Sequence, residues 1–273
     1  MSELKAVILI DNIPKDALCG EWGLSIHIEY HDAKFLLDTG ASGNFLRNAE
    51  QMGIHIDEVD YGILSHAHYD HSNGIPDFFR INPNAKFYLR KTAAENCYSK
   101  HFLIKAYIGI QKGTLQKYTE RIVYADGNYP LCEGVWLLPH TTEGLENTGT
   151  KAKLYRKENH RFTADDFSHE QSLVFETSKG LIILNSCSHG GADNIITEVS
   201  HAFPQQKIYA MIGGFHLFRS SAAEVQAFAK RVQNTGIEKV MTGHCTGQKA
   251  FDEMKEILGA SLFQLYTGFT FEI

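Results

Sequence analysis

One short stretch of the chain restricts its fold more than any other, because it crowds ionisable side chains into a single loop. Residues 64–74, LSHAHYDHSNG, place three histidines and an aspartate within six positions, directly after the apolar residues 61–64. Imidazoles protonate near neutral pH, and like charges a few ångströms apart repel each other. A metal ion is the usual group that organises such a cluster, so we expect a fold that brings further ligands to this loop.

The place of the cluster along the chain supports a metal site. If residues 59–64 form a buried strand, residues 66–71 form the loop at its carboxyl end, where open α/β sheets commonly place their sites. His66 and His68 lie two positions apart, so both rings can point the same way, whereas Asp70 and His71 can face a second position nearby. This spacing predicts two neighbouring ions. The alternative is a solvated loop that merely contains histidines.

The donor types indicate which metals fit. Imidazole nitrogens and carboxylate oxygens suit zinc, and they also suit iron or manganese. Four local ligands cannot close two coordination shells, so other parts of the chain must contribute. We expect zinc, with one or two ions per chain.

Apolar runs and turn residues predict alternating strands and helices. Strands are expected at 4–10, 24–30, 34–38, 59–65, 87–90, 172–177, 181–185, 207–212, 239–242 and 262–266. Helices are expected at 42–52, around 75–79, and at 192–202, 222–233 and 248–258. The sequence TSKG at 177–180 predicts a hairpin turn. Strands inside and helices outside predict a layered α/β sandwich, and no linker-like tract divides the chain.

Residues 91–166 form the least regular segment. Possible helices at 92–99 and 114–121 and short strands at 122–125 and 135–138 precede a polar segment at 140–160. A long irregular stretch inside a compact domain is often an active-site cover, and a mobile surface loop is the alternative. We therefore expect a single domain over 1–273, with a cover inserted at about 91–166.

Composition and charge exclude several kinds of partner. The net charge of −6 provides no positive field for nucleic acid or anionic lipid. The first apolar run, residues 6–10, is too short for a signal peptide or a membrane span. Five widely spaced cysteines without a C-x-x-C pair argue against a disulfide framework or a zinc ribbon. We expect a reduced, cytoplasmic protein that acts on a small molecule, with no nucleic-acid or membrane partner; the oligomeric state is left open.

Further ligand candidates lie near the ends of later predicted strands. His189 in NSCSHGG, His216 in IGGFHL and His244 in TGHCTG each follow a strand, and His169 in DDFSHEQ precedes one. His169 is a candidate ligand, a support for a ligand or a capping residue, and His216 is a candidate substrate contact or a structural histidine. His101 and His140 have no evident partners, although either could reach the site from the cover. His27 is expected at the surface or as a satisfied core residue.

Several of these motifs resemble those of a known protein family. H-A-H-Y-D-H resembles the H-x-H-x-D-H motif of the metallo-β-lactamase-fold hydrolases, and LLDTG, which contains Asp38, resembles their supporting first motif. The order of the later motifs fits along nearly the whole chain. The stretches GLSIHIEY, FLLDTGASGNFLRNA, DDFSHEQSLVFETSKGLIILNSCSHGG and MIGGFHL are similar to the dihydropterin-ribofuranosylaminobenzene 5′-phosphate synthase-like subgroup.

The resemblance implies an αββα sandwich with metal ions at one edge of its two sheets. It assigns the first ion to His66, His68 and His189, and the second ion to Asp70, His71 and His244. Asp38 would hydrogen-bond to the histidine loop. In one respect the chain departs from the superfamily, which often has an aspartate bridging both ions after the strand that corresponds to 181–185. Ser186 and Cys187 follow here. Either Cys187 or another group substitutes, or the second ion is held weakly or not at all.

The expected chemistry is metal-assisted hydrolysis of an ester, lactone, thioester or phosphoester. Asp70 would orient or deprotonate the attacking water, and His216 would contact the substrate or protonate the leaving group. One alternative is a pterin-type synthase or transferase, for which Tyr107, Phe102, Tyr118 and Trp136 could stack on a bicyclic ring. The other alternative is a metal-dependent sensor that binds a ligand without turnover.

Overall fold

Two seven-stranded sheets form the body of the protein. The computed structural model describes residues 2–273. The first sheet has the order β18-β1-β2-β3-β4-β5-β8, in which strands β18 to β3 are antiparallel and β3 to β8 are parallel. Its strands are β1 (Leu4–Ile10), β2 (Ser25–Tyr30), β3 (Ala33–Leu37), β4 (Tyr61–Ile63), β5 (Lys86–Arg90), β8 (Ile122–Ala125) and β18 (Thr270–Glu272).

The second sheet has the order β17-β16-β15-β14-β13-β10-β9. Its strands are β9 (Tyr129–Cys132), β10 (Val135–Pro139), β13 (Gln171–Thr177), β14 (Gly180–Leu184), β15 (Ile208–Gly213), β16 (Lys239–Thr242) and β17 (Leu262–Gln264). Strands β14 to β17 are parallel, whereas β9, β10, β13 and β14 are antiparallel. Thr177 pairs with Gly180 across the β13–β14 connection, which confirms the predicted hairpin turn.

Apolar residues at successive strand positions bury both faces of each sheet. Ile26 of β2 and Phe175 of β13 pack in the layer between the sheets, whereas Leu36 of β3 and Ile183 of β14 face outward into further apolar layers. Such continuous apolar strands are typical of sheets covered on both sides. The helices that cover them are α1 (Asn44–Gln51) and α3 (Ile75–Ile81) on the first sheet, and α6 (Ala192–Ala202), α7 (Ala222–Asn234) and α8 (Gln248–Leu258) on the second.

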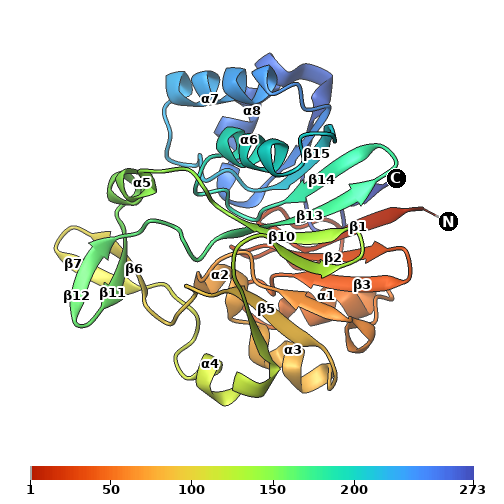
Figure 1. Ribbon diagram of the computed structural model, residues 1–273, viewed down its shortest axis with the longest axis vertical. Coiled ribbons are helices and arrows are strands. Elements are labelled where there is room, and N and C mark those ends of the chain that lie inside the picture. The colour runs from red at the N-terminus through yellow and green to blue at the C-terminus, as the bar shows by residue number, and fades with distance from the viewer. Residues whose placement is uncertain (1) are drawn as a thin grey trace.

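These layers form the αββα sandwich that the resemblance implied. In Figure 1, α6, α7 and α8 lie above the strands, and α1 and α3 lie below them. The predicted fold class is therefore confirmed. Among residues 2–273, no helix combines the length and the apolar character needed to cross a lipid bilayer.

Residues 91–166 divide between the sandwich and a third, four-stranded sheet. Strands β8, β9 and β10 complete edges of the two main sheets. The third sheet has the order β12-β11-β6-β7 and protrudes at the left of Figure 1. It consists of β6 (Cys97–His101), β7 (Ile104–Tyr107), β11 (Leu154–Glu158) and β12 (Arg161–Ala164), accompanied by α4 (Thr114–Lys117) and α5 (Leu145–Ala152).

The helix predicted at 92–99 is wrong. Strand β6 begins at Cys97 and pairs with β7 on one side and β11 on the other, so tertiary pairing overrides a weak local preference. The helix predicted at 114–121 is broken into α4 and a short 3₁₀ turn at Thr119–Arg121. The segment 140–160 is also more regular than its polar composition indicated, because it contains α5 and β11.

The carboxyl ends of strands from both sheets meet at one edge of the sandwich. In the first sheet, β3 and β4 run parallel and are followed by Asp38 and by the loop that leads to α2 (Tyr69–Ser72). In the second sheet, β14 and β16 run parallel to β15 and are followed by the loops that carry His189 and His244. The topology thus brings residues far apart in sequence to one place.

Candidate metal centre

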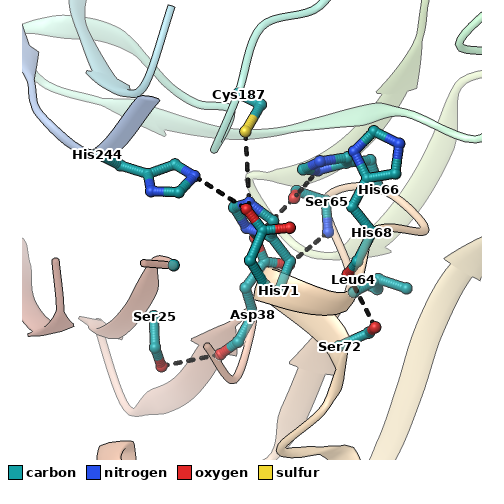
Figure 2. A network of polar contacts seen from close by, with 12 residues as sticks. Ser25, Asp38, Leu64, Ser65, His66, His68, His71, Ser72, Cys187 and His244 are labelled. Carbon is teal, nitrogen blue, oxygen red and sulfur yellow. Dashed lines mark hydrogen bonds and ion pairs between the residues drawn. The ribbon is translucent and has the colours of Figure 1, made fainter. Parts of the chain in front are cut away.

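Asp38 holds the histidine loop, defined here as residues 65–71, in position. Its fully buried carboxylate accepts hydrogen bonds from the backbone N–H of Ser65 at 2.7 Å and from the Ser65 hydroxyl at 2.6 Å. It also accepts one from Nδ1 of His71 at 2.8 Å (Figure 2). Because Nδ1 is used in this bond, Nε2 is the ring nitrogen of His71 that faces the site.

His66, His68 and His189 form a first set of candidate ligands. One ring nitrogen from each lies within 4.8 Å of the others. The Ser65 hydroxyl uses its only hydrogen in the bond to Asp38, so its oxygen accepts a hydrogen bond from Nδ1–H of His66 at 2.9 Å, which leaves Nε2 of His66 unprotonated. The Nε2 atoms of all three histidines are buried and have no hydrogen-bond partner among residues 2–273. Buried polar atoms are normally paired, so this set fits a metal ion.

The electrostatics of the first set favour neutral imidazoles. Burial, reinforced by the neighbouring histidines, lowers the pKa of His66 and of His189 well below the usual range. Burial likewise lowers the pKa of His68 to about 3. Metal ions bind the deprotonated ring nitrogen, so these three side chains are in the binding form at neutral pH.

Asp70, His71 and His244 form a second set. Oδ2 of Asp70 lies 3.6 Å from Nε2 of His71 and 3.5 Å from Nε2 of His244. The ring of His244 is oriented from behind, because its Nδ1 hydrogen-bonds to Oδ1 of Asn12 at 3.0 Å. The backbone N–H of His244 donates to the carboxylate of Asp11 at 2.8 Å. Asp11 and Asn12, which directly follow β1, therefore hold His244, a candidate ligand that follows β16, in position.

The second set favours a positive charge at its centre. Burial alone would lower the pKa of His71, but the carboxylates of Asp70 and Asp38 raise it to about 10. Burial alone would raise the pKa of Asp70, but the imidazoles of His71 and His244 hold it well below its usual range. A site that stabilises a proton between two carboxylates in this way also suits a metal cation.

His169 supports the histidine loop from the other side. The backbone N–H of Ala67 donates to Nδ1 of His169 at 3.1 Å, so Nδ1 is unprotonated and Nε2 carries the proton. Nε2 then donates to Asp165 at 3.1 Å, and the thiol of Cys97 lies 3.7 Å from the same nitrogen. Of the three roles that the sequence left open for His169, this arrangement favours support of a ligand loop.

Glu170 supports the loop that carries His189. Its carboxylate accepts hydrogen bonds from the backbone N–H groups of His189 at 3.0 Å and of Gly190 at 3.3 Å. The same carboxylate contacts His140, whose other ring nitrogen lies 3.1 Å from Glu198. The expectation that His140 has no partner is therefore wrong. Burial would lower the pKa of His140, but the two glutamates raise it to about 9.

A cavity of about 390 Å³ opens beside both ligand sets. His68, Asp70 and His216 line it. The His216 ring lies 4.5 Å from the His189 ring, measured between centroids, and its Nδ1 has no hydrogen-bond partner among the described residues. His216 is thus placed to meet a bound molecule.

Basic and aromatic side chains line the outer part of this cavity. Lys100 of β6, Lys153 and Arg219 line it together with Trp22 and Phe218, whose rings lie edge to face at 5.2 Å. His101 also lines it, so the third sheet does reach the site.

The predicted stacking residues lie elsewhere. Among Tyr107, Phe102, Tyr118 and Trp136, only Phe102 lines a neighbouring cavity, which also contacts Lys100 and Arg219. Tyr118 packs on Phe79, and Trp136 packs on Phe203 and donates to Glu176 at 2.8 Å. The aromatic residues beside the ligand sets are instead Trp22 and Phe218, which the sequence patterns did not single out.

Comparison with known proteins places this geometry in a family. Residues 23–168, more than half of the chain, match the model of the metallo-beta-lactamase superfamily. The chain belongs to the metallo-β-lactamase superfamily. The predicted resemblance is therefore confirmed. Membership implies a metal centre, often of zinc, and the histidine, aspartate and cysteine clusters described above are present to form one.

Individual relatives cover nearly the whole chain. Over 259 residues the chain is 29% identical to 7,8-dihydropterin-6-methyl-4-(beta-D-ribofuranosyl)-aminobenzene-5'-phosphate synthase of Methanocaldococcus jannaschii, covering 90% of this chain and 88% of the relative. The crystal structure of Tm1679, described as a metal-dependent hydrolase of the beta-lactamase superfamily, has a TM-score of 0.85 and 28% identity over 99% of each chain. YhfI from Bacillus subtilis, with a TM-score of 0.58 and 12% identity over 99% of each chain, shares the fold.

This metallo-β-lactamase-superfamily chain places cysteines where the resemblance implied a bridging aspartate. Cys187 lies in the loop after β14, and its Sγ is 3.3 Å from Nε2 of His71 (Figure 2). Cys245 lies next to it, with 3.4 Å between the two sulfur atoms, and accepts a hydrogen bond from the backbone N–H of His216 at 3.2 Å.

Sequence reasoning predicted the supporting role of Asp38 but missed Asn12, which orients His244 in this superfamily member. Glu170 lies within the quoted stretch DDFSHEQ, but its contact with the loop of His189 was not predicted. A weak signal existed, because Asn12 directly follows a buried strand and Glu170 directly follows His169.

Proposed function

We propose that this protein is a metal-dependent hydrolase that cleaves a small phosphoester. One observation carries the proposal. Buried Nε2 atoms of four histidines, His66, His68, His189 and His244, have no hydrogen-bond partner among the described residues and gather with Asp70 beside a cavity. Such a donor set suits a metal centre that a substrate can approach.

Each ligand set has a role in this proposal. His66, His68 and His189 would hold one zinc ion, and Asp70, His71 and His244 would hold a second. When bound, zinc supplies Lewis acidity and lowers the pKa of a coordinated water to near neutrality. Asp38, through its hydrogen bonds to Ser65 and His71, keeps the ligand rings in one orientation.

Two side chains of the protein would handle protons. The Asp70 carboxylate lines the cavity, so it can orient the attacking water and accept its proton. His216 lines the same cavity with a ring nitrogen that has no partner among the described residues, so it can donate a proton to the leaving group.

The lining of the cavity favours an anionic substrate. Lys100, Lys153 and Arg219 contribute positive charge, and Asp70 is the one acidic side chain among the described residues that line it. Lysine and arginine are the side chains that bind phosphate groups. Trp22 and Phe218 offer an apolar surface to the rest of the molecule. Among the esters considered, a phosphoester therefore fits best.

A synthase of pterin type is the second candidate. The chain is 29% identical over 90% of its length to a relative named as a dihydropterin-linked synthase. Trp22 and Phe218 could also stack on a bicyclic ring. A synthase would need to bind the dihydropterin, whereas a hydrolase needs only water as its second substrate.

Turnover of simple substrates by zinc-loaded protein tests the proposal. We expect hydrolysis of p-nitrophenyl phosphate or bis(p-nitrophenyl) phosphate in preference to p-nitrophenyl acetate. His68→Ala should reduce the rate at least about 100-fold, because it removes a ligand of the centre that activates water. His55→Ala is the matched control, since His55 is exposed and lies outside the site.

Three other results would contradict the hydrolase. If the metal-loaded protein hydrolyses none of these p-nitrophenyl substrates, the hydrolase proposal loses its main support. Dihydropterin binding, detected by fluorescence, would then favour the synthase. A ligand that raises the melting temperature without any chemical change would favour a sensor.

A further inference from the structure

We infer that the β6–β7 hairpin of the third sheet docks on the surface of a lipid bilayer that contains anionic lipids. The hairpin tip, defined here as Phe102, Leu103 and Ile104, lies where β6 turns into β7. The inference goes beyond the proposed function and is independent of it, because lipid binding needs neither a metal ion nor turnover.

The hairpin tip holds the three most exposed large apolar side chains among residues 2–273. Phe102, Leu103 and Ile104 are 97%, 94% and 73% exposed. The other exposed large apolar side chains in the described part of the chain reach at most 46%. A single exposed apolar residue is ordinary, whereas a contiguous apolar group at the surface marks a contact with a partner or a membrane.

The backbone of the tip indicates a role for the Phe102 side chain outside the fold. His101 pairs with Ile104, so Phe102 and Leu103 form a two-residue turn. Phe102 has a φ of 53°, a left-handed conformation that glycine, asparagine and aspartate adopt at lower cost in such turns. A bulky apolar residue at this position does not favour the hairpin itself, so a contact of its ring with another molecule explains it better.

The third sheet is basic, although the chain as a whole is acidic. Its four strands contain five lysine or arginine residues and one acidic residue, Glu158. The net charge of −6, on which the expectation of no lipid partner rests, is an average over the whole chain. Salt screens charges that lie far apart, so the attraction of anionic lipid depends on the charges close to the surface.

Two lysines lie on aromatic rings beside the tip. The ammonium nitrogen of Lys105 is 3.9 Å from the centroid of the Phe162 ring and 5.1 Å from that of Tyr155. The ammonium nitrogen of Lys157 is 5.5 Å from the Phe162 ring. A ring, unlike a carboxylate, leaves the positive charge of the ammonium group in place. Aromatic rings and lysines with extended side chains are also typical of the lipid–water interface.

The size of the tip favours a bilayer over a protein partner. A stable protein interface buries roughly 800 Å² on each partner, which is more than three side chains of a hairpin provide. A bilayer binds a small apolar group when basic residues surround it.

The position of the hairpin suits contact with a flat surface. The yellow β6–β7 hairpin lies at the left margin of the molecule in Figure 1, away from the two main sheets. Phe102 also lines a cavity of about 510 Å³ together with Lys100 and Arg219. Insertion of the tip would therefore place this cavity beside the lipid headgroups.

Vesicle sedimentation with the full chain tests the inference. We expect the wild type to sediment with vesicles of equal parts phosphatidylcholine and phosphatidylglycerol at low salt. Vesicles of phosphatidylcholine alone should bind it at least about tenfold more weakly, because the lysines then meet no anionic headgroup. High salt should weaken binding to the mixed vesicles.

The double variant Phe102→Asn, Leu103→Ser removes apolar surface from the tip. Asparagine tolerates a positive φ, so the hairpin should keep its fold, and binding to the mixed vesicles should fall at least about tenfold. Phe263→Ser, at an exposed aromatic position on β17, is the matched control. Phe102→Trp should keep binding, and its tryptophan emission should shift to the blue on the mixed vesicles because indole enters the interface.

The double variant Lys105→Glu, Lys157→Glu tests the lysines. It should lose the preference for vesicles that contain phosphatidylglycerol, because glutamate repels the anionic headgroups. The double variant Lys230→Glu, Lys249→Glu changes the net charge by the same amount at exposed positions on α7 and α8. This control should bind like the wild type.

Several results would overturn the inference. They are a wild type that does not sediment with the mixed vesicles, a tip variant that binds like the wild type, and equal binding to both kinds of vesicle. Light scattering that shows a wild-type dimer and a monomeric tip variant would assign the tip to a second copy of the chain instead. Circular dichroism of each variant shows whether lost binding reflects loss of the fold.

Discussion

At the scale of single residues, the site depends on side chains that orient other side chains. Asp38 fixes His71, Ser65 fixes His66, and Asn12 fixes His244, each through the ring nitrogen that does not face the ions. Such supports commonly change metal affinity by about 10- to 100-fold when they are removed. Removal of a direct ligand should therefore lower the metal affinity more than removal of a supporting residue.

His244→Ala tests the second ion directly. We expect two ions per chain in the wild type and one in the variant, because the variant keeps His66, His68 and His189. Elemental mass spectrometry of purified protein measures this ratio. His201→Ala, at an exposed position, should keep both ions. One ion in both wild type and His244→Ala would mean that His244 is not a ligand.

Much of the site at this scale could be predicted from the sequence, because ligands cluster in short motifs. The three histidines of one loop and the three later ones that follow strands all lie near each other in the structure. Asn12 and His244, by contrast, are 232 positions apart, and nothing local links them. Contacts of this kind depend on tertiary packing, so the sequence predicted the supporting role of Asp38 but not that of Asn12.

At the scale of elements, the apolar pattern of a strand predicts that the strand forms. It does not predict the environment of a polar residue within it. β2 was expected as a strand, but its His27 was expected at the surface or as a satisfied core residue. It pairs with Val7 and Leu36, is 2% exposed, and its Nε2 has no hydrogen-bond partner within residues 2–273. Burial, with help from Lys34 and Lys5, lowers its pKa to about 4.

His27 should make the fold sensitive to acid. Its folded pKa of about 4 lies below the ordinary value of 6.5, so between these values only the unfolded chain binds the proton. Stability is then complete above about pH 6.5 and falls by on the order of 3 kcal/mol as the pH approaches 4. Denaturant unfolding near pH 7 and pH 4 should show a smaller loss for His27→Phe than for wild type. Equal losses in both proteins would exclude His27 as the cause.

The elements that the sequence did not predict are short, and most of them belong to the small third sheet. Helices α6 and α8 have the long amphipathic pattern that sequence reasoning detects, and their bounds match the expectation. Strand β6 has a mostly half-exposed burial pattern, and β12 alternates between exposed and half-exposed residues. Such strands carry little apolar signal, and only their pairing partners define them.

At the scale of the whole molecule, the ligands join the two sheets. The histidine loop and Asp70 follow β4 of the first sheet, whereas His189 and His244 follow β14 and β16 of the second. A bound ion therefore connects both layers in the folded state and has no equivalent site in the unfolded chain.

Removal of metal should lower the melting temperature. Binding at 100 times the dissociation constant stabilises a protein by about 2.7 kcal/mol, which corresponds to roughly 5–10 °C for a chain of this size. Differential scanning calorimetry with and without a chelator measures the difference, and His68→Ala should show a smaller one. If the chelator does not change the melting temperature, the two sheets do not share a bound metal ion.

The apolar layer between the sheets, which includes Ile26 and Phe175, has a further consequence. Because each ligand set takes side chains from both sheets, the thickness of this layer sets how far the side chains after β4 lie from those after β14 and β16. A larger side chain in this layer, far from the site, would push the sheets apart and lengthen the ligand distances within each set. The size of core residues therefore tunes the metal radius that the edge of the sandwich can accept.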